Sequence, residues 1–148
     1  MQLLSPRCGL LECAESDALH VAEGIAPFDR ATRYVMVARE EEWPFAWLQS
    51  LDEPALAFVV APLEMLFPDR AEEALCAYAK GEEACNSSLL AAYGIVVLDR
   101  DPARLTINLL APLVVDFERK RARQIILDGP LEQTRELLEP ALRSLAHA

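Results

Sequence analysis

Short apolar segments separated by turn residues are the feature of this sequence that most constrains its fold. The segments are rich in β-branched and aromatic side chains, a pattern typical of strands rather than helices. Gly or Pro beside Asp or Glu fills many of the intervals between them. We count eight such segments: Leu19–Ala22, Tyr34–Ala38, Phe45–Leu51, Leu56–Ala61, Tyr93–Leu98, Leu105–Leu110, Pro112–Phe117 and Arg123–Leu127. Their number and spacing predict a mainly β fold, a small β-barrel or an open β-roll of about eight short strands.

Two other segments have the composition of helices. Pro68–Tyr93 is rich in Ala, Glu and Leu, and a break is expected at Gly81. Pro130–Ala148 carries leucines at helical spacing and predicts a C-terminal amphipathic helix. Pro140 lies inside that pattern and should kink the helix or divide it in two.

A chain of 148 residues that is 53% hydrophobic can bury a core without metal or disulfide support. We expect a β-barrel domain over residues 1–128 and a helical extension over residues 129–148. No apolar stretch approaches the ~20 residues that a membrane span requires. The N-terminus lacks the basic region of a signal peptide. A cytoplasmic protein that does not contact membranes is therefore expected.

The net charge of −10 is unevenly distributed. Residues 1–117 contain 19 acidic and 8 basic residues, whereas residues 118–148 contain 5 acidic and 6 basic ones. Such an acidic field repels nucleic acid and accelerates encounters with basic partners, although an acidic surface also serves solubility alone. The basic run Glu118–Arg123 is interpreted as a turn between strands, so no direct nucleic-acid binding is predicted. The acidic clusters are Glu40–Glu42, Asp52–Glu53, Glu72–Glu73 and Glu82–Glu83.

The sequence contains no motif of a known catalytic or nucleotide-binding site. Its two histidines are His20, in a strand-like run, and His147, next to the last residue. The four cysteines are spaced C-x4-C and C-x8-C, unlike the close pairs of zinc sites, and are interpreted as free thiols. No catalysis, metal or cofactor is predicted. The cysteines are Cys8, Cys13, Cys76 and Cys85.

A polar residue and a proline interrupt the most strand-like part of the chain, residues 105–116. Pro112 lacks a backbone N–H, so the stretch Leu110–Pro112 is expected to form a corner or a sheet edge. Asn108 precedes this break and can bond the backbone groups that the break exposes. We interpret Asn108 and Pro112 as residues of a barrel corner rather than as partner contacts.

Four stretches resemble, in the same order, the bacterial flagellar assembly factor FliW family. The match runs from about Glu23 to Leu127, and the combination of the LQS…AFVV block with the NL-x-AP…Q-x-IL block is the specific part. The stretches read EGIAPFD (Glu23–Asp29), PFAWLQSLDEPALAFVVAP (Pro44–Pro62), FPDR (Phe67–Arg70) and TINLLAPLVVDFERKRARQIIL (Thr106–Leu127).

The resemblance implies a cytoplasmic, barrel-like binding protein without catalysis. Proteins of this family bind flagellin, and many bind and antagonise the translational repressor CsrA. Free flagellin competes for the factor, which couples flagellin synthesis to export. The alternative is a small acidic β-barrel that binds a ligand or serves as an enzyme subunit, with redox or metal-binding cysteines.

The chain departs from the family pattern at several positions. The family turn G-[IL]-P-G-F is Gly24-Ile25-Ala26-Pro27-Phe28 here, so its local geometry must differ. The usual Asp-Pro after the AFVV strand is Ala61-Pro62, and an Asn common after the NL-x-AP block is Asp116. The segment from Ala71 to Leu90 matches poorly, and the C-terminal amphipathic stretch is longer than the family implies.

Two partner surfaces are hypothesised from these patterns. Flagellin is assigned to the turn Gly24–Phe28 and the adjoining strand Phe45–Leu51, because aromatic anchors dominate contacts with apolar helix faces. The residues of this hypothesis are Ile25, Phe28 and Phe45. A basic, CsrA-like partner is assigned to acidic loops around Glu40, Glu41, Glu42, Glu72 and Glu73.

Overall fold

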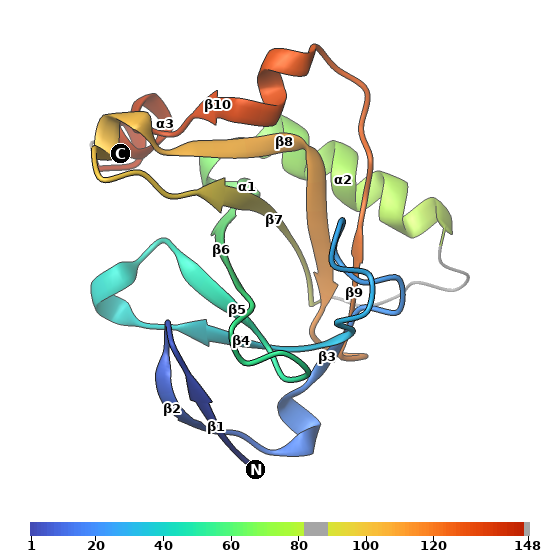
Figure 1. Cartoon of the computed structure of the whole chain (residues 1–148). Coiled ribbons are helices and arrows are strands. Elements are labelled where there is room, and N and C mark those ends of the chain that lie inside the picture. Colours follow the sequence, from blue (N-terminus) through green and yellow to red (C-terminus); the bar gives the residue numbers. More distant parts are fainter. Residues whose placement is uncertain (82–88, 147–148) are drawn as a thin grey trace.

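The computed structural model describes residues 1–81 and 89–146. Strands β3 to β9 form a closed barrel in this part of the chain, with each strand antiparallel to the next along the chain from β3 to β9 (Figure 1). A parallel pairing of β9 with β3, at His20 and Arg121, completes the circle. The mainly β fold expected from the sequence is thus confirmed. The strands are β3 (Leu19–His20), β4 (Arg33–Ala38), β5 (Ala46–Ser50), β6 (Ala57–Pro62), β7 (Leu90–Val97), β8 (Thr106–Asp116) and β9 (Arg121–Gln124).

The two strands expected on either side of Ala111 are the two halves of one long strand, β8. Tyr93 of β7 pairs with Leu113 and Ile95 pairs with Asn108, so four residues of β8 lie opposite Gly94 alone. This irregularity bends β8 sharply (Figure 1). A bulge of this kind allows one strand to turn a barrel corner without ending.

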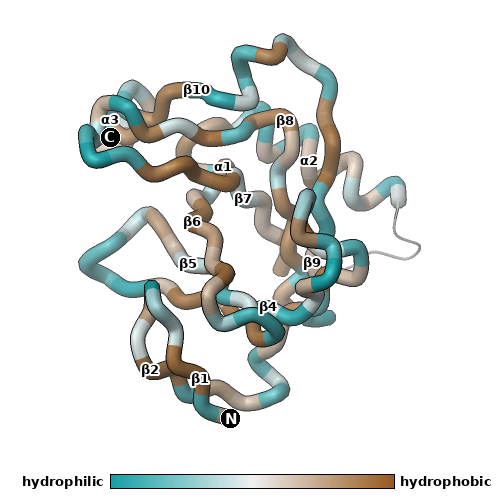
Figure 2. The backbone as a smooth tube through the Cα atoms, in the orientation of Figure 1, coloured by the Kyte–Doolittle hydropathy of each residue, from teal (hydrophilic) through white to brown (hydrophobic). Residues whose placement is uncertain are grey.

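The apolar core has two parts, which lie on the two sides of the barrel wall. Alternate residues of β6 divide between them: Val59 and Ala61 pack toward the helices, and Val60 packs inside the barrel. This is the two-residue period of a strand that is buried on both faces. Figure 2 shows hydrophobic residues along β6 and β7 and hydrophilic residues in the β4–β5 connection.

A hairpin that the sequence analysis missed precedes the barrel. It consists of β1 (Gln2–Ser5) and β2 (Gly9–Glu12), and a single helical turn, η1 (Glu15–Asp17), leads from it to β3. Leu3 and Leu11 pack against the outside of the barrel. The hydroxyl of Ser5 also donates to Oε1 of the fully buried Gln49 at 2.5 Å, which ties the hairpin to β5.

The expected helix Pro68–Tyr93 is correct only in its first part. A short helix, α1 (Leu63–Leu66), precedes α2 (Pro68–Gly81). The break predicted at Gly81 lies at the limit of the described residues. Residues 90–93 are the start of β7 rather than helix, a correction with a clear cause. Ala91, Ala92 and Tyr93 pair with Val115, Val114 and Leu113 of β8, in that order. This tertiary pairing overrides the local helix propensity. Residues 82–88 lie outside the described part of the chain.

The expected C-terminal helix is also shorter than predicted. The segment forms a helical turn, η4 (Leu131–Arg135), a two-residue strand, β10 (Glu136–Leu137), and α3 (Glu139–Ala146). β10 pairs with β8, and Leu138 is fully buried in the core beneath the helices. Pro140 is the second residue of α3, where a missing N–H costs little. The proline therefore begins a helix instead of kinking one. No helix in the described residues is long and apolar enough to cross a membrane.

Candidate functional site

An apolar groove with an acidic rim lies beside the connection between β4 and β5. This connection contains one helical turn, η2 (Glu40–Glu42). We call the surface formed by Trp43, Phe45, Trp47 and Leu98 the aromatic groove; it lines a pocket of about 320 Å³ together with Glu41, Glu42 and Val59. Trp43 is 61% exposed, an unusual position for so large an apolar side chain. An exposed tryptophan in an apolar groove is typical of a protein-binding surface.

Neighbours in the sequence hold the aromatic groove in place. The indole Nε1–H of Trp47 donates to Oε2 of Glu42 at 3.3 Å. The other carboxylate oxygen of Glu42 has no hydrogen bond and lies 3.8 Å from Nη1 of Arg39 as an ion pair. Glu42 is thus a structural residue of the groove, whereas Glu40 and Glu41 are exposed on the same turn.

The acidic residues hypothesised for one partner do not form one surface. Glu72 and Glu73 lie on α2 rather than in a loop, and Glu73 is paired with Arg70 at 3.0 Å. Figure 1 shows α2 and the β4–β5 connection on different sides of the barrel. The hypothesis that both acidic clusters belong to loops is therefore corrected for Glu72 and Glu73. Glu82 and Glu83 lie outside the described residues.

The turn from Gly24 to Phe28 presents a second exposed aromatic side chain. Gly24 has φ of +69°, and a Cβ there would lie 2.6 Å from both Cα of Asp29 and the carbonyl oxygen of Phe28. Only glycine fits this conformation without strain. Phe28 is 43% exposed and packs edge-on against Phe58, with ring centroids 5.8 Å apart. The turn therefore holds the Phe28 ring at the surface in a defined orientation.

The other two residues hypothesised to contact flagellin, Ile25 and Phe45, do not share a surface with Phe28. Ile25 is 0% exposed and packs inside the barrel, so it supports the turn and presents nothing to a partner. Phe45 lies in the aromatic groove, and the turn lies beside β9 on the opposite side of the molecule (Figure 1). Phe28 and Phe45 consequently belong to two surfaces. Phe45 instead shares its pocket with Glu41 and Glu42, which were assigned to the other partner.

Gln124 connects the turn to the corner of β8. Its Oε1 accepts a hydrogen bond from the backbone N–H of Ala26 at 3.1 Å, and its Nε2 donates to the carbonyl of Ala111 at 3.3 Å. The sequence analysis did not identify this role, although Gln124 belongs to the Q-x-IL block. Leu98 was likewise missed, because only the pairing of β6 with β7 brings the end of β7 to the aromatic groove.

Asn108 and Pro112 lie where β8 bends. The side-chain oxygen of Asn108 accepts a hydrogen bond from the backbone N–H of Leu110 at 2.9 Å, within the stretch that has no regular partner on β7. Pro112 is buried, and its carbonyl accepts from the N–H of Ile125 at 2.8 Å. Both residues face the protein's own backbone, and the importance of Asn108 for stability remains a prediction.

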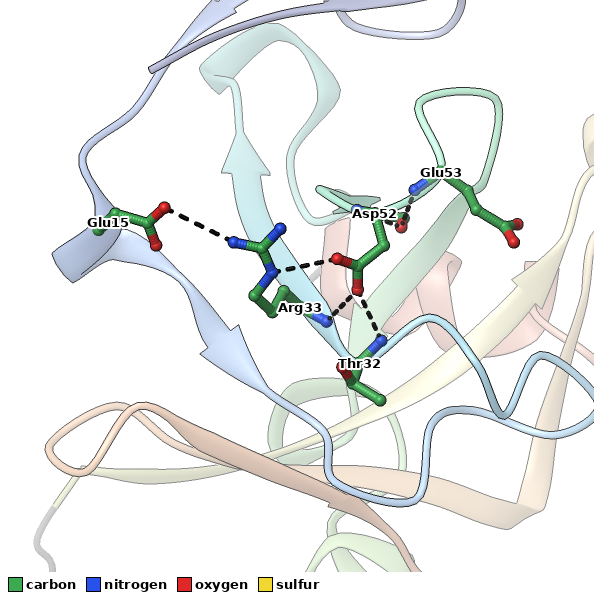
Figure 3. A network of polar contacts seen from close by, with 6 residues as sticks. Glu15, Thr32, Arg33, Asp52 and Glu53 are labelled. Atoms are coloured by element: carbon green, nitrogen blue, oxygen red, sulfur yellow. Dashed lines mark hydrogen bonds and ion pairs between the residues drawn. The ribbon is translucent and has the colours of Figure 1, made fainter.

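A polar network fixes the chain immediately after the turn (Figure 3). Oδ2 of Asp52 accepts from the backbone N–H groups of Thr32 and Arg33 at 2.9 and 3.0 Å, and Oδ1 lies 3.0 Å from Nε of Arg33. Burial alone would raise the pKa of Asp52, but these hydrogen bonds and the guanidinium charge outweigh it and lower the pKa. The guanidinium also lies 3.5 Å from Glu15.

The ionisable groups of this network hold neighbouring segments of the chain together. Beside the network, burial and the charges of Asp52 and Glu53 raise the pKa of Tyr34 to about 12. A phenol that stays protonated at neutral pH does not provide a general base. His20 is exposed, and the described residues contain no group of three or more potential metal ligands. Cys8, Cys13 and Cys76 are free thiols; Cys85 and His147 lie outside the described residues.

Comparison with known proteins connects this architecture to one family. A family model described as FliW protein matches residues 2–138. A flagellar assembly factor FliW from Syntrophus aciditrophicus (strain SB) is 34% identical over 128 residues, which covers 86% of this chain and 81% of the relative. The protein of the same name from Caldanaerobacter subterraneus subsp. tengcongensis is 33% identical over 153 residues and covers all of both chains. A crystal structure of the flagellar assembly factor FliW superposes with a TM-score of 0.76 and 25% identity, over 93% of this chain and 96% of that one.

Proposed function

This chain belongs to the FliW family of flagellar assembly factors, and from that premise we propose that it binds flagellin and a CsrA-like translational regulator in the cytoplasm. In this proposal it is a binding protein without catalysis, which antagonises the regulator and couples flagellin synthesis to export. The observation that carries the proposal is a pair of exposed aromatic side chains. Trp43 belongs to the β4–β5 connection and Phe28 to the Gly24–Phe28 turn, and these two segments lie on opposite sides of the barrel (Figure 1).

The aromatic groove is assigned to the CsrA-like regulator. A protein that binds RNA carries a basic surface, and the groove offers Glu40 and Glu41 beside its apolar lining. Charges at the rim of such a surface mainly accelerate association, while a central aromatic side chain provides most of the affinity. Trp43 is the expected anchor.

The Phe28 surface is assigned to flagellin. Flagellin termini form amphipathic helices in the filament, and an apolar helix face requires an apolar surface before export. Phe28 stands on a turn whose backbone is already fixed by Gly24 and by the hydrogen bond from Ala26 to Gln124. Little conformational entropy is lost when such a preorganised side chain binds.

Two alanine variants test this assignment, and each is the control for the other. Titration calorimetry of the purified protein with flagellin and with CsrA should show that Phe28→Ala weakens flagellin binding by about 2 kcal/mol and leaves CsrA binding unchanged. Trp43→Ala should have the reverse effect. Leu131→Ala removes an even more exposed apolar side chain from η4 and should change neither affinity.

The assignment fails if both variants weaken the same partner, or if both bind normally. Circular dichroism and thermal melting of each variant exclude unfolding as the cause of a weaker affinity. A variant of Phe28 that melts far below wild type would instead identify this ring as part of the core.

The acidic rim is tested by association kinetics. Charge reversal of Glu40 and Glu41 to Lys should slow the association with CsrA, most at low salt, because salt screens interactions between exposed charges. Glu42 is left intact because it holds Trp47. Reversal of Glu72 on α2 is the matched control and should leave the association rate unchanged. An association rate that does not respond to salt in the wild-type protein would contradict this part of the proposal.

A further inference from the structure

The N-terminal hairpin β1–β2 is connected to the aromatic groove by the side chain of Arg39. Nη2 of Arg39 donates to the backbone carbonyl of Cys8, at the tip of the hairpin, at 2.6 Å. Nη1 of the same guanidinium lies 3.8 Å from Oε1 of Glu42. Figure 1 shows the hairpin tip close to the start of the β4–β5 connection. One guanidinium therefore contacts both the hairpin and the carboxylate that holds Trp47.

Arg39 determines where the carboxylate of Glu42 lies. Oε1 of Glu42 is shielded from solvent and accepts no hydrogen bond within residues 1–81 and 89–146, so the guanidinium is its compensating charge. A buried carboxylate oxygen without a cation nearby is costly, and the side chain would turn toward water. Such a turn would also withdraw Oε2 from the indole N–H of Trp47, from which it accepts a hydrogen bond at 3.3 Å. The position of the Trp47 ring thus depends on Arg39.

The hairpin in turn determines where the guanidinium lies. Cys8 is buried, and its N–H donates to the hydroxyl oxygen of Ser5 at 2.9 Å. The same hydroxyl donates to Gln49 of β5, so the hairpin tip is fixed against the barrel. A guanidinium is a planar, rigid fork. When the Cys8 carbonyl holds one of its nitrogens, the other is directed toward Glu42.

The hairpin keeps this position only through its contacts with the barrel. Leu3 and Leu11 lie on its inward face and pack against the outside of the barrel. Leu4 and Leu10 form a cross-strand pair on the other face and are 73% and 64% exposed. An isolated two-stranded hairpin is marginally stable in water. A change that loosens the inward face should therefore withdraw the hairpin tip from the groove.

We propose that Arg39 is a positioning residue, through which the docked hairpin holds the aromatic groove in its binding geometry. While the hairpin is docked, Arg39 and Glu42 hold the Trp47 ring in place; when it is released, the ring loses this support and the groove binds its partner more weakly. The inference rests on the proposed function only for the identity of that partner, the CsrA-like regulator. The Gly24–Phe28 turn lies on the opposite side of the barrel and should not respond.

The indole N–H of Trp47 provides a readout that requires no partner. The chain contains two tryptophans, Trp43 and Trp47, so nuclear magnetic resonance of the full chain shows two indole N–H signals. In Arg39→Met, which keeps the aliphatic stem and removes the guanidinium, the Trp47 signal should shift and its hydrogen exchange should accelerate about tenfold. The backbone N–H of Ala26, which donates to Gln124, is the internal reference and should be unchanged.

Titration calorimetry with the two partners adds a binding readout. Arg39→Met should weaken CsrA binding about tenfold and leave flagellin binding unchanged. Arg39→Lys should weaken it only about threefold, because an ammonium keeps the charge but lacks the fork that reaches both acceptors. Arg33→Met is the matched control, because Arg33 begins β4, has a side chain that is 36% exposed against 35% for Arg39, and contacts Glu15 and Asp52 instead. It should change neither the Trp47 signal nor the affinity for CsrA.

A second pair of variants loosens the hairpin without altering the groove itself. Leu11→Asp places a charge on the inward face and should reproduce both the Trp47 shift and the weaker CsrA binding. Leu10→Asp changes the neighbouring exposed residue and should have neither effect. Leu11→Asp combined with Arg39→Met should weaken CsrA binding no further than Arg39→Met alone, because both changes break the same connection. Arg39→Met introduces no buried charge, so its result decides the matter even if Leu11→Asp does not fold.

An unchanged Trp47 signal in Arg39→Met, or in a folded Leu11→Asp variant, overturns the inference. Additive effects of the two changes overturn it as well, because the hairpin would then act on the groove by another route. A shifted Trp47 signal with unchanged affinity for CsrA supports the inference and contradicts instead the assignment of CsrA to the groove.

Discussion

The aromatic groove and the Gly24–Phe28 turn each present an exposed aromatic ring, but different kinds of contact hold them. In the groove, Arg39, Glu42 and Trp47 hold one another within a single connection and the strand that follows it. The turn is held by Phe58 on another strand and by Gln124, which is 98 residues from Ala26 in the sequence. The contacts of Glu42 with Arg39 and Trp47 are therefore local, although Leu98 reaches the groove from the end of β7, whereas the contacts of the turn depend on a closed barrel.

This difference has a consequence for mutational studies. Changes in the groove should alter binding with little change in stability, because few barrel contacts are lost. Changes in the residues that hold the turn, such as Gly24, should alter binding and stability together. Four predictions test the comparison, ordered from the largest expected effect to the smallest.

Gly24→Ala should cost about 3 kcal/mol in the free energy of unfolding, because it combines left-handed backbone strain with a collision against neighbouring backbone atoms. Gly9→Ala is the matched control. Gly9 also has a positive φ, +77°, but nothing lies within 4 Å of the added Cβ, so the cost should be about 1 kcal/mol. Denaturant unfolding of both variants measures the difference. Equal losses would mean that the turn is not tightly packed against Asp29.

Asn108→Leu should cost about 2 kcal/mol, because the backbone N–H of Leu110 loses its acceptor where β8 bends. Chemical denaturation should show this loss of stability. The affinity of each folded molecule for either partner should stay unchanged, because Asn108 bonds the protein's own backbone. A stable Asn108→Leu variant that no longer binds a partner would transfer this residue from the corner to an interface.

Acidification should remove the contribution of Asp52 to the free energy of unfolding, about 1 kcal/mol. This contribution belongs to the turn and not to the groove, because Asp52 holds the backbone of Thr32 and Arg33 just after the turn. The folded pKa of Asp52 is lowered, so its stabilisation is complete above the ordinary aspartate value, about 3.9, and is lost as the pH falls through the lower folded pKa. Asp52→Asn should flatten this part of the pH dependence of unfolding. If the Asp52→Asn variant loses as much stability at low pH as the wild type, other carboxylates cause the loss.

Glu42→Gln should have the smallest effect, about 0.5 kcal/mol, because it removes a long, partly exposed ion pair and keeps an acceptor for the Trp47 indole. Tryptophan fluorescence should shift while the melting temperature stays close to that of the wild type. A loss as large as that of Asn108→Leu would contradict the view that the contacts of Glu42 are local.

The sequence predicted the barrel because strand signals are local. Alternating apolar residues and turn residues marked β4, β5 and β6 to within one or two positions. The hairpin β1–β2 was missed because its strands are short and are stabilised by contacts with Val35 and Leu51 rather than by their own pattern. The helical interpretation of residues 90–93 was wrong for a related reason: their pairing with β8 is a long-range contact.

Among the residues of the candidate sites, too, the sequence predicted the local features and missed those that depend on long-range contacts. The local association of acidic and aromatic residues around Glu41 and Phe45 was visible in the sequence, although the two were assigned to different partners. The burial of Ile25 and the bridge through Gln124 were not visible, because both depend on strands that are adjacent only after the barrel closes. No local pattern distinguishes a turn residue that points outward, such as Phe28, from one that points inward.

The pairing of β3 with β9 also bears on how the protein folds during synthesis. His20 and Arg121 are 101 residues apart (121 minus 20), so the ribosome must release most of the chain before this pairing is possible. Contacts between distant residues slow folding, because the loop between them must first be ordered. The antiparallel pairs from β3 to β8 connect neighbours in the chain and can form earlier. Until β9 arrives, β3 and β8 expose free edges, and this interval is when a nascent chain is most prone to aggregation.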